Sequence, residues 1–152
     1  MRIGRCVNAV PVQRQKLNHF VRRRITGAAL EVVHIKERPG QLIADPARAL
    51  AIAPEARVVL HVGNFTPAKN HAALIAAAAV IGARRRDVVF VLVGDGALRS
   101  TIETAVEARG LGAGFRFTGS RDDVPALLRA ADLLVLPSRW EGLPGVVLEA
   151  LA

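Results

Sequence analysis

From Arg57 onward, short runs of apolar and β-branched residues alternate with longer stretches of helical character. Each short run is followed directly by a glycine or a proline, residues that commonly mark the end of a strand. The run at 88–93 is continuously apolar, which is typical of a strand buried on both faces. We therefore predict four strands, over Val58–Val62, Val88–Val93, Phe115–Thr118 and Leu133–Leu136.

The stretches between these runs predict helices that cross from one strand to the next. Asn70 and Asp123 suit the N-cap position, Pro125 is tolerated in a first turn, and Gly110 suits the position just after a helix. The predicted helices are Asn70–Arg85, Ala97–Arg109, Asp123–Ala131 and one from Pro144 or Gly145 to Ala152. This alternation predicts a Rossmann-like α/β fold, a parallel sheet with helices on both faces and functional residues at the carboxyl ends of its strands.

Residues 1–56 are patterned poorly and form a separate predicted region, a basic N-terminal segment and linker ahead of the domain at 57–152. Residues 1–40 show no sustained period of either kind, and only Asp45–Leu50 suggests a short helix. This segment also carries most of the net charge of +8, with nine Lys or Arg against two acidic residues in 1–40. It is interpreted as an interaction tail, a replacement domain or sequence from a shifted reading frame.

Composition narrows the class of protein. The chain has 152 residues, the size of one ordinary domain, and 51% of them are hydrophobic, as in a packed globular protein. Its one cysteine, Cys6, allows neither an internal disulfide nor a cysteine zinc site. There is no apolar run of the ~20 residues that a bilayer crossing needs, and no secretory signal pattern. A cytoplasmic location is therefore expected.

The segment that follows the fourth predicted strand is the richest in candidate chemistry. Glu141 lies in the loop before a predicted helix and Glu149 lies inside that helix. Exposed backbone amides at the start of such a helix attract phosphate, and carboxylates accept charge-assisted hydrogen bonds from sugar and ribose hydroxyls. The alternative from spacing alone is that both glutamates are ordinary solvated side chains.

A second candidate is the loop between the first strand and its helix. Gly63 permits a close approach of backbone and ligand, and Lys69 could neutralise a diphosphate near the helix start, although a lone loop lysine is usually just solvated. The turn at 94–96 follows a strand as a dinucleotide-binding turn would, but Arg99 stands where the third glycine is required. The four histidines have no metal-ligand spacing, and the nucleophile-elbow and P-loop motifs are absent from the sequence.

Taken together, these segments resemble the donor-binding domain of the retaining glycosyltransferases of family 4, which have the GT-B fold of two facing Rossmann-like domains. The resemblance covers Arg57 to Ala152, and its most specific part is the pair Glu141 and Glu149, which are separated by seven residues in a loop and its helix. Its other motifs, in order, are VGNF with KN at 62–70, LVGDGALR at 92–99, FTGSR at 117–121, and PSRWEGLP at 137–144.

The resemblance implies a role for each matched position. Glu141 would contact the transferred sugar and Glu149 the ribose, while Lys69 would bind the donor diphosphate. The other implied donor-binding positions are Gly63 and Asn64, the backbone at Leu143, Pro144 and Gly145, and, near the nucleobase, Ser120 and Arg121. The family uses no metal ion and no cofactor, because cationic side chains stabilise the leaving diphosphate of the nucleotide-sugar donor. Sugar transfer to a glycan, lipid or small-molecule acceptor would retain the anomeric configuration.

The chain departs from the family pattern in ways that predict an incomplete enzyme. Many relatives carry Arg where this chain has Asn64, and no acceptor-binding domain is recognisable in 1–56. The isolated chain is therefore expected to be inactive, and any peripheral membrane contact would come from the missing N-terminal domain. The alternatives are a non-catalytic nucleotide or nucleotide-sugar binding module, a nucleic-acid-binding protein using the N-terminal arginines, and a dinucleotide-dependent oxidoreductase. No nucleic-acid partner is expected, because the basic segment holds only one aromatic residue, Phe20, and no recognisable motif.

Overall fold

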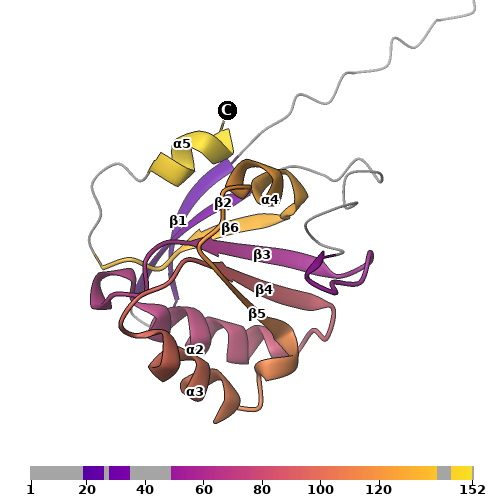
Figure 1. The fold of residues 1–152 in the computed structure, drawn as a ribbon, viewed down its shortest axis with the longest axis vertical. Coiled ribbons are helices and arrows are strands. Elements are labelled where there is room, and N and C mark those ends of the chain that lie inside the picture. The colour runs from indigo at the N-terminus through magenta and orange to yellow at the C-terminus, as the bar shows by residue number, and fades with distance from the viewer. Residues whose placement is uncertain (1–18, 26–27, 35–48, 140–144, 152) are drawn as a thin grey trace, which may run out of the picture.

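Four parallel strands form the centre of the protein. The computed structural model describes the backbone of residues 19–25, 28–34, 49–139 and 145–151, and the side chains of residues 49–139 and 145–150. The strands are β3 (Arg57–Val62), β4 (Val88–Val93), β5 (Phe115–Gly119) and β6 (Leu133–Leu136), and they pair in the order β6-β3-β4-β5. The predicted parallel sheet is confirmed, with β5 ending one residue later than predicted. Figure 1 shows its strands fanning across the molecule.

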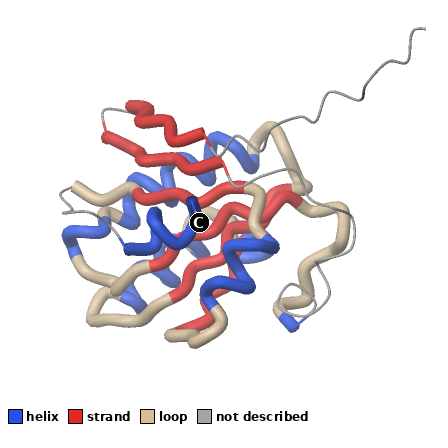
Figure 2. The backbone as a smooth tube through the Cα atoms, turned by 90° about the horizontal axis from the view of Figure 1, so that it is seen from above, coloured by secondary structure: helices blue, strands red, loops and turns tan. Residues whose placement is uncertain are grey.

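Helices cover both faces of this sheet, as predicted. Helices α2 (His71–Gly82) and α3 (Arg99–Glu107) lie on one face, and α4 (Val124–Ala130) and α5 (Gly145–Leu151) on the other (Figures 1 and 2). Short 3-10 turns, η1 (Pro67–Lys69) and η2 (Gly112–Gly114), precede α2 and β5. None of the helices in the described part of the chain is long and apolar enough to cross a membrane.

The helices are shorter than predicted, and their ends differ in detail. Asn70 is the N-cap residue of α2, but its side chain makes no capping bond, because the residue takes a left-handed conformation (φ 51°) that ends η1. After α3 the backbone amides of Gly110 and Leu111 donate to Glu107 O (2.8 Å) and Val106 O (3.1 Å). This is the Schellman pattern, and it confirms the prediction that Gly110 follows the helix.

An antiparallel hairpin extends the sheet beyond β6. It consists of β1 (His19–Ile25) and β2 (Ala28–His34), and β2 pairs antiparallel with β6, so that Val33 lies opposite Leu134. The sequence predicted no strand in this basic segment, although its backbone completes a sheet of six strands in the order β1-β2-β6-β3-β4-β5. Most of the short helix predicted at 45–50 lies outside the described residues.

Two apolar layers hold the helices onto the sheet. Alternate residues of β4 face opposite sides, so Val91 packs towards α4 and α5 while Leu92 packs towards α2 and α3. The fully buried Leu60 and Leu134 belong to the first layer, and the fully buried Phe65 belongs to the second. The continuous apolar run at 88–93 therefore supplies both layers, as expected for a central parallel strand.

Asp132 fixes β6 beside β3 at the amino ends of the strands. Its Oδ2 accepts a hydrogen bond from the Val58 amide (2.7 Å), its own amide donates to Val58 O (2.9 Å), and its Oδ1 accepts from Arg57 Nη1 (3.0 Å). These bonds set the register that places Leu60 beside Leu134. The carboxyl ends of β3 and β6 consequently meet at the same edge of the sheet.

Candidate functional site

The candidate site lies where the order of the strands reverses. From β3 the chain passes through α2 to β4 on one side, whereas β6 returns to the other side of β3. In open α/β sheets, ligands bind outside the carboxyl ends of two strands that diverge in this way. The loop after β3 and the loop after β6 meet here, because the Arg139 amide donates to Ala68 O at 2.9 Å. Two segments that the sequence separates by about seventy residues thus share one edge.

Lys69 lies across the end of β3. A side-chain carbon at Gly63 would stand 3.0 Å from Lys69 Cε and 3.4 Å from Lys69 Nζ, so the lysine side chain folds back over the glycine backbone. The predicted close approach at Gly63 is therefore made by Lys69 itself. This contact holds the ammonium at the carboxyl edge of the sheet, with Asn64 exposed on the same loop.

A buried aromatic cluster supports this loop from below. The His71 ring packs edge-on against Phe65 and His61, with ring centroids 4.7 and 4.9 Å apart. His61 Nδ1 donates to Val135 O at 3.0 Å, which ties the cluster to β6. Burial, with the nearby His61 and Lys69, lowers the pKa of His71 from 6.5 to about 4. The imidazole of His71 is therefore neutral at physiological pH. Its burial could not be predicted from the sequence.

The glycine-containing turn after β4 packs against the loop after β3. The Phe65 amide donates to Asp95 O (2.8 Å), and the Leu98 amide donates to Phe65 O (3.2 Å). A side-chain carbon at Gly96 would stand 2.8 Å from Phe65 O, so only glycine fits without a shift. The backbone of the loop after β3 therefore fills the space next to Gly96. This packing argues against the dinucleotide-binding alternative, in which the same glycines would face a pyrophosphate.

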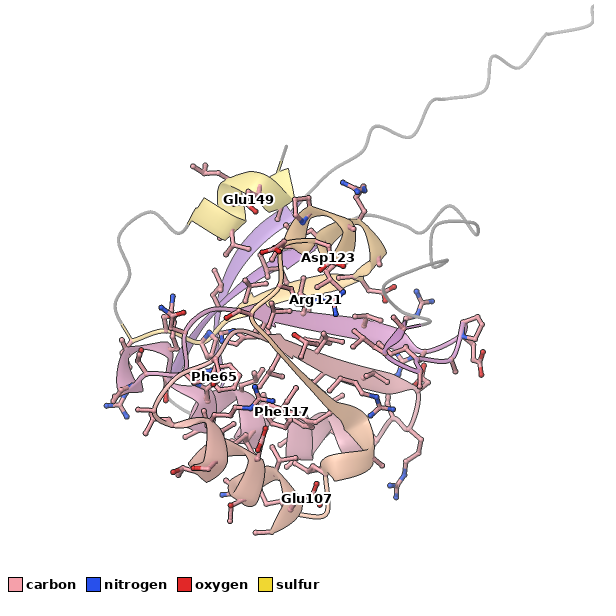
Figure 3. All side chains as sticks on the ribbon, in the orientation of Figure 1. Phe65, Glu107, Phe117, Arg121, Asp123 and Glu149 are labelled. Atoms are coloured by element: carbon pink, nitrogen blue, oxygen red, sulfur yellow. The ribbon has the colours of Figure 1, made fainter. Side chains whose placement is uncertain are left out.

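Local carboxylates bind the guanidinium groups that follow β4 and β5. Arg99 donates to Asp95 (3.0 Å) and Glu103 (2.8 Å), and Arg121 donates to both oxygens of Asp123 at 2.6 Å. The hydrogen bond between Arg121 and Asp123 raises the pKa of the arginine and lowers the pKa of the carboxyl. Figure 3 shows this pair side by side. Ser120 is exposed beside it, so the predicted nucleobase position is a surface of local ion pairs and backbone.

The helix after β6 carries the last predicted site residues. Gly145 begins α5, and Glu149 is exposed on it, while Val147 and Ala150 are buried against the sheet. Figure 3 shows Glu149 on the opposite side of the sheet from Phe65. The predicted residues Glu141, Leu143 and Pro144 lie outside the described residues. Within the described ranges, no three His, Cys, Asp or Glu side chains are grouped as a metal ion would require.

Comparisons with known proteins agree with this fold. The family of glycosyl transferases group 1 matches residues 45–152. EpsF of Bacillus subtilis is 36% identical over 113 residues, which are 74% of this chain and 29% of EpsF. The alpha-D-kanosaminyltransferase of Streptomyces kanamyceticus is 40% identical over 96 residues, 62% of this chain and 25% of that enzyme.

A solved structure supports the same assignment. Anabaena HepE in complex with UDP superposes with a TM-score of 0.65 at 27% identity, over 77% of this chain and 32% of HepE. The parallel sheet and its helices therefore have the Rossmann-like fold found in GT-B glycosyltransferases, and the chain spans about a quarter to a third of the length of these relatives. By its sequence match over residues 45–152 and by its fold, the chain belongs to the glycosyl transferases group 1 family.

Proposed function

We propose that this chain supplies the nucleotide-sugar donor site of a retaining, metal-independent glycosyltransferase. The observation that carries the proposal is the meeting of two loops at the topological switch point, where the Arg139 amide bonds Ala68 O and Lys69 lies over Gly63. An ammonium held at the carboxyl edge of a parallel sheet faces the region where such folds bind phosphates. The family of the chain supports a transferase.

Each group of the donor is assigned to residues of this chain. Lys69 neutralises the diphosphate together with the backbone amides of Leu143 and Gly145, on either side of Pro144, and Glu149 accepts hydrogen bonds from the ribose hydroxyls. Glu141 binds the transferred sugar. No resident cofactor is assigned, because Lys69 and the backbone amides supply the positive charge that stabilises the leaving diphosphate.

The nucleobase is assigned to the backbone near Ser120 and Arg121. The Arg121 guanidinium is already bound by Asp123, which favours recognition through main-chain groups over a free cation. The similar structure of HepE was solved with UDP, which makes a uridine nucleotide the first donor to test.

The proposed transfer exchanges one bond at the anomeric carbon for another on the same face. The bond from that carbon to the diphosphate oxygen breaks, and a bond to the acceptor hydroxyl oxygen forms. The proton of that hydroxyl passes to the departing diphosphate, whose charge Lys69 stabilises. Holding the hydroxyl against the donor contributes much of the rate, and it requires a surface that faces the donor site.

We assign that facing surface to an acceptor domain beyond this chain, since the chain covers about a quarter to a third of EpsF, the kanosaminyltransferase and HepE. A glycan, lipid or small-molecule acceptor is expected there, in a cytoplasmic enzyme, and the chain alone is expected to transfer no sugar. The alternative is a non-catalytic nucleotide or nucleotide-sugar binding module. Transfer by a chimera, in which this chain replaces the matched 96-residue segment of the kanosaminyltransferase, would favour the enzyme. Loss of that transfer on Glu141→Gln would support the role of the glutamate.

Calorimetry with UDP and UMP tests the donor site directly. Lys69 acts on the second phosphate, so UDP should bind more tightly than UMP, and Lys69→Gln should weaken UDP binding about five- to tenfold with little effect on UMP. Arg129→Gln is the matched control, since Arg129 is an exposed cation on α4, which covers the face opposite α2. Equal affinity for the two nucleotides in the unmodified chain would exclude Lys69 from the site.

A further inference from the structure

A cavity of about 290 Å³ lies between α2 and α3, beside the loop after β3. Its walls include the apolar side chains of Ile75, Leu98 and Ile102, and the hydroxyl-bearing Thr66 and Thr101. None of the described residues assigned above to the donor site lines it, so it is a separate feature of the same edge of the domain.

The charge around this cavity is unbalanced. Two arginines line it, Arg109 and Arg139, and no aspartate or glutamate is among the lining residues. The Arg109 guanidinium donates to Ala105 O (3.1 Å), and Arg139 is exposed and forms no ion pair with any other residue that the structure describes. Arg99 and Arg121, by contrast, are each paired with carboxylates. The electrostatic potential at this cavity is therefore positive.

The first turn of α2 adds to that potential. Asn70, His71 and Ala72 all line the cavity, and the Asn70 side chain makes no capping hydrogen bond. The amino end of a helix of twelve residues carries partial positive charge, which an anion would balance. His71, only 3% exposed, is a further polar side chain of this wall, and neither of its ring nitrogens has a hydrogen-bond partner among the described residues.

We propose that this cavity binds a small amphipathic organic anion, a phosphate or carboxylate carried on a short apolar body. The arginines and the α2 terminus would hold the anionic group, and the walls at Ile75, Leu98 and Ile102 would bury the apolar part. The volume lies just below the range of pockets for drug-sized ligands, which fits a compact ligand of this kind. Simple insertion of the surface into a bilayer is disfavoured, since the large exposed hydrophobic side chains of the described part are Val80 and Leu148, on two helices that cover opposite faces of the sheet.

Occupation of the cavity would act on the loop that carries Lys69. Thr66 and Asn70 flank that lysine in the chain, and the Arg139 amide is bonded to Ala68 O. A ligand that draws Arg139 inward would therefore tighten the contact between the loops after β3 and β6. The ligand class is inferred from the cavity alone and does not depend on the donor-site proposal.

Hexyl phosphate is the probe, followed by amide chemical shifts in the full 152-residue chain labelled with ¹⁵N. Saturable shifts should centre on Ala72, Thr101 and Arg139, and inorganic phosphate should bind about tenfold more weakly because it buries no apolar surface. Arg139→Gln should weaken hexyl phosphate about fivefold, and added salt should do likewise, whereas Arg129→Gln should leave the affinity unchanged.

Two threonines of α3 give a steric test. Thr101 and Thr104 are both exposed on this helix, but only Thr101 lines the cavity. Thr101→Phe should fill it and abolish the shifts, while Thr104→Phe should preserve them. Absence of saturable shifts, or equal binding by the two variants, would overturn the proposal.

Vesicles containing phosphatidic acid separate the two sources of such an anion. Cosedimentation that Thr101→Phe abolishes would assign the site to a lipid headgroup. Binding of hexyl phosphate without vesicle binding would assign it to a soluble phosphate ester or carboxylate. The UDP measurements are read independently, because their variants alter residues outside this cavity.

Discussion

Replacing His71 with leucine should remove much of the acid sensitivity of this protein. His71 is buried against Phe65 and His61 at the start of α2, and its pKa is lowered from 6.5 to about 4. The causes are burial first, and then the electrostatic interactions of His71 with His61 and with Lys69. His71→Leu keeps a similar side-chain volume, and it removes two ring nitrogens that have no hydrogen-bond partner in the described part of the chain.

The sign and the size follow from proton linkage. Because the native pKa lies below the unfolded value, the unfolded chain binds a proton near pH 6.5 that the native chain takes up only near pH 4. Stability is therefore complete above pH 6.5 and falls as the pH drops towards 4. At about 1.4 kcal/mol per pKa unit, the loss from this group reaches about 3 kcal/mol. At neutral pH the variant should be as stable as the unmodified chain or more so, since it buries no unpaired polar group.

Urea unfolding followed by circular dichroism at several pH values from 7.5 to 4 measures this difference. The free energy of unfolding should fall less for His71→Leu than for the unmodified chain, with the gap opening between pH 6.5 and 4. Leu74→Met is the control, because it alters a buried side chain of the same helix without removing a titratable group. Parallel curves for the unmodified chain and His71→Leu would refute the assignment of the low pKa to His71.

Three further substitutions test the loops and the donor edge. Gly96→Ala should lower the free energy of unfolding by about 2 kcal/mol, because the φ of Gly96 is +155° and backbone atoms of Phe65 crowd it. Gly145→Ala has open space around it and should be neutral or stabilising. Thermal melts measure both variants. Asp132→Ala should cost about 2 kcal/mol in urea titrations by leaving the Val58 amide without its carboxylate, and a value near zero would contradict that bond. Glu149→Gln should weaken UDP and UMP about equally in calorimetry, since both carry the ribose, and an effect on UDP alone would move the residue to the diphosphate.

The parallel half of the fold could be predicted because its signals are local. The apolar run Val88–Val93 by itself predicts a strand buried on both faces, and a glycine or proline stands at or just after the end of each parallel strand. The hairpin over His19–His34 could not be predicted in the same way. Its basic stretch Arg22–Arg24 carries no alternating apolar pattern, and the partner of β2 is β6, about a hundred residues later. Strand pairing over such a distance depends on tertiary contacts that no short window contains.

In the candidate site, too, the features set by local sequence could be predicted, and those set by long-range contacts could not. The position of Lys69 near a glycine was readable from the loop, and the pairing of Arg121 with Asp123, two residues apart, was within reach of local charge patterns. The burial of His71 could not be predicted, because a histidine at the start of a helix is usually solvated and its burial depends on the sheet against which the helix packs. The bond from Arg139 to Ala68 likewise exists only once β6 lies beside β3.

The antiparallel hairpin has a consequence for synthesis on the ribosome. β2 is made early, yet β6, the strand that pairs with the edge of β2 that β1 leaves open, begins only at Leu133. Ribosomes adding about 5–20 residues per second therefore need roughly 5–20 s to supply it. During that interval the hairpin presents unpaired backbone amides and carbonyls to other chains. We therefore expect the nascent protein to depend on a chaperone, or on slow translation at low temperature, until β6 emerges. Because closing so long a loop is also slow in refolding, the arrival of β6 sets the pace at which the hairpin becomes protected.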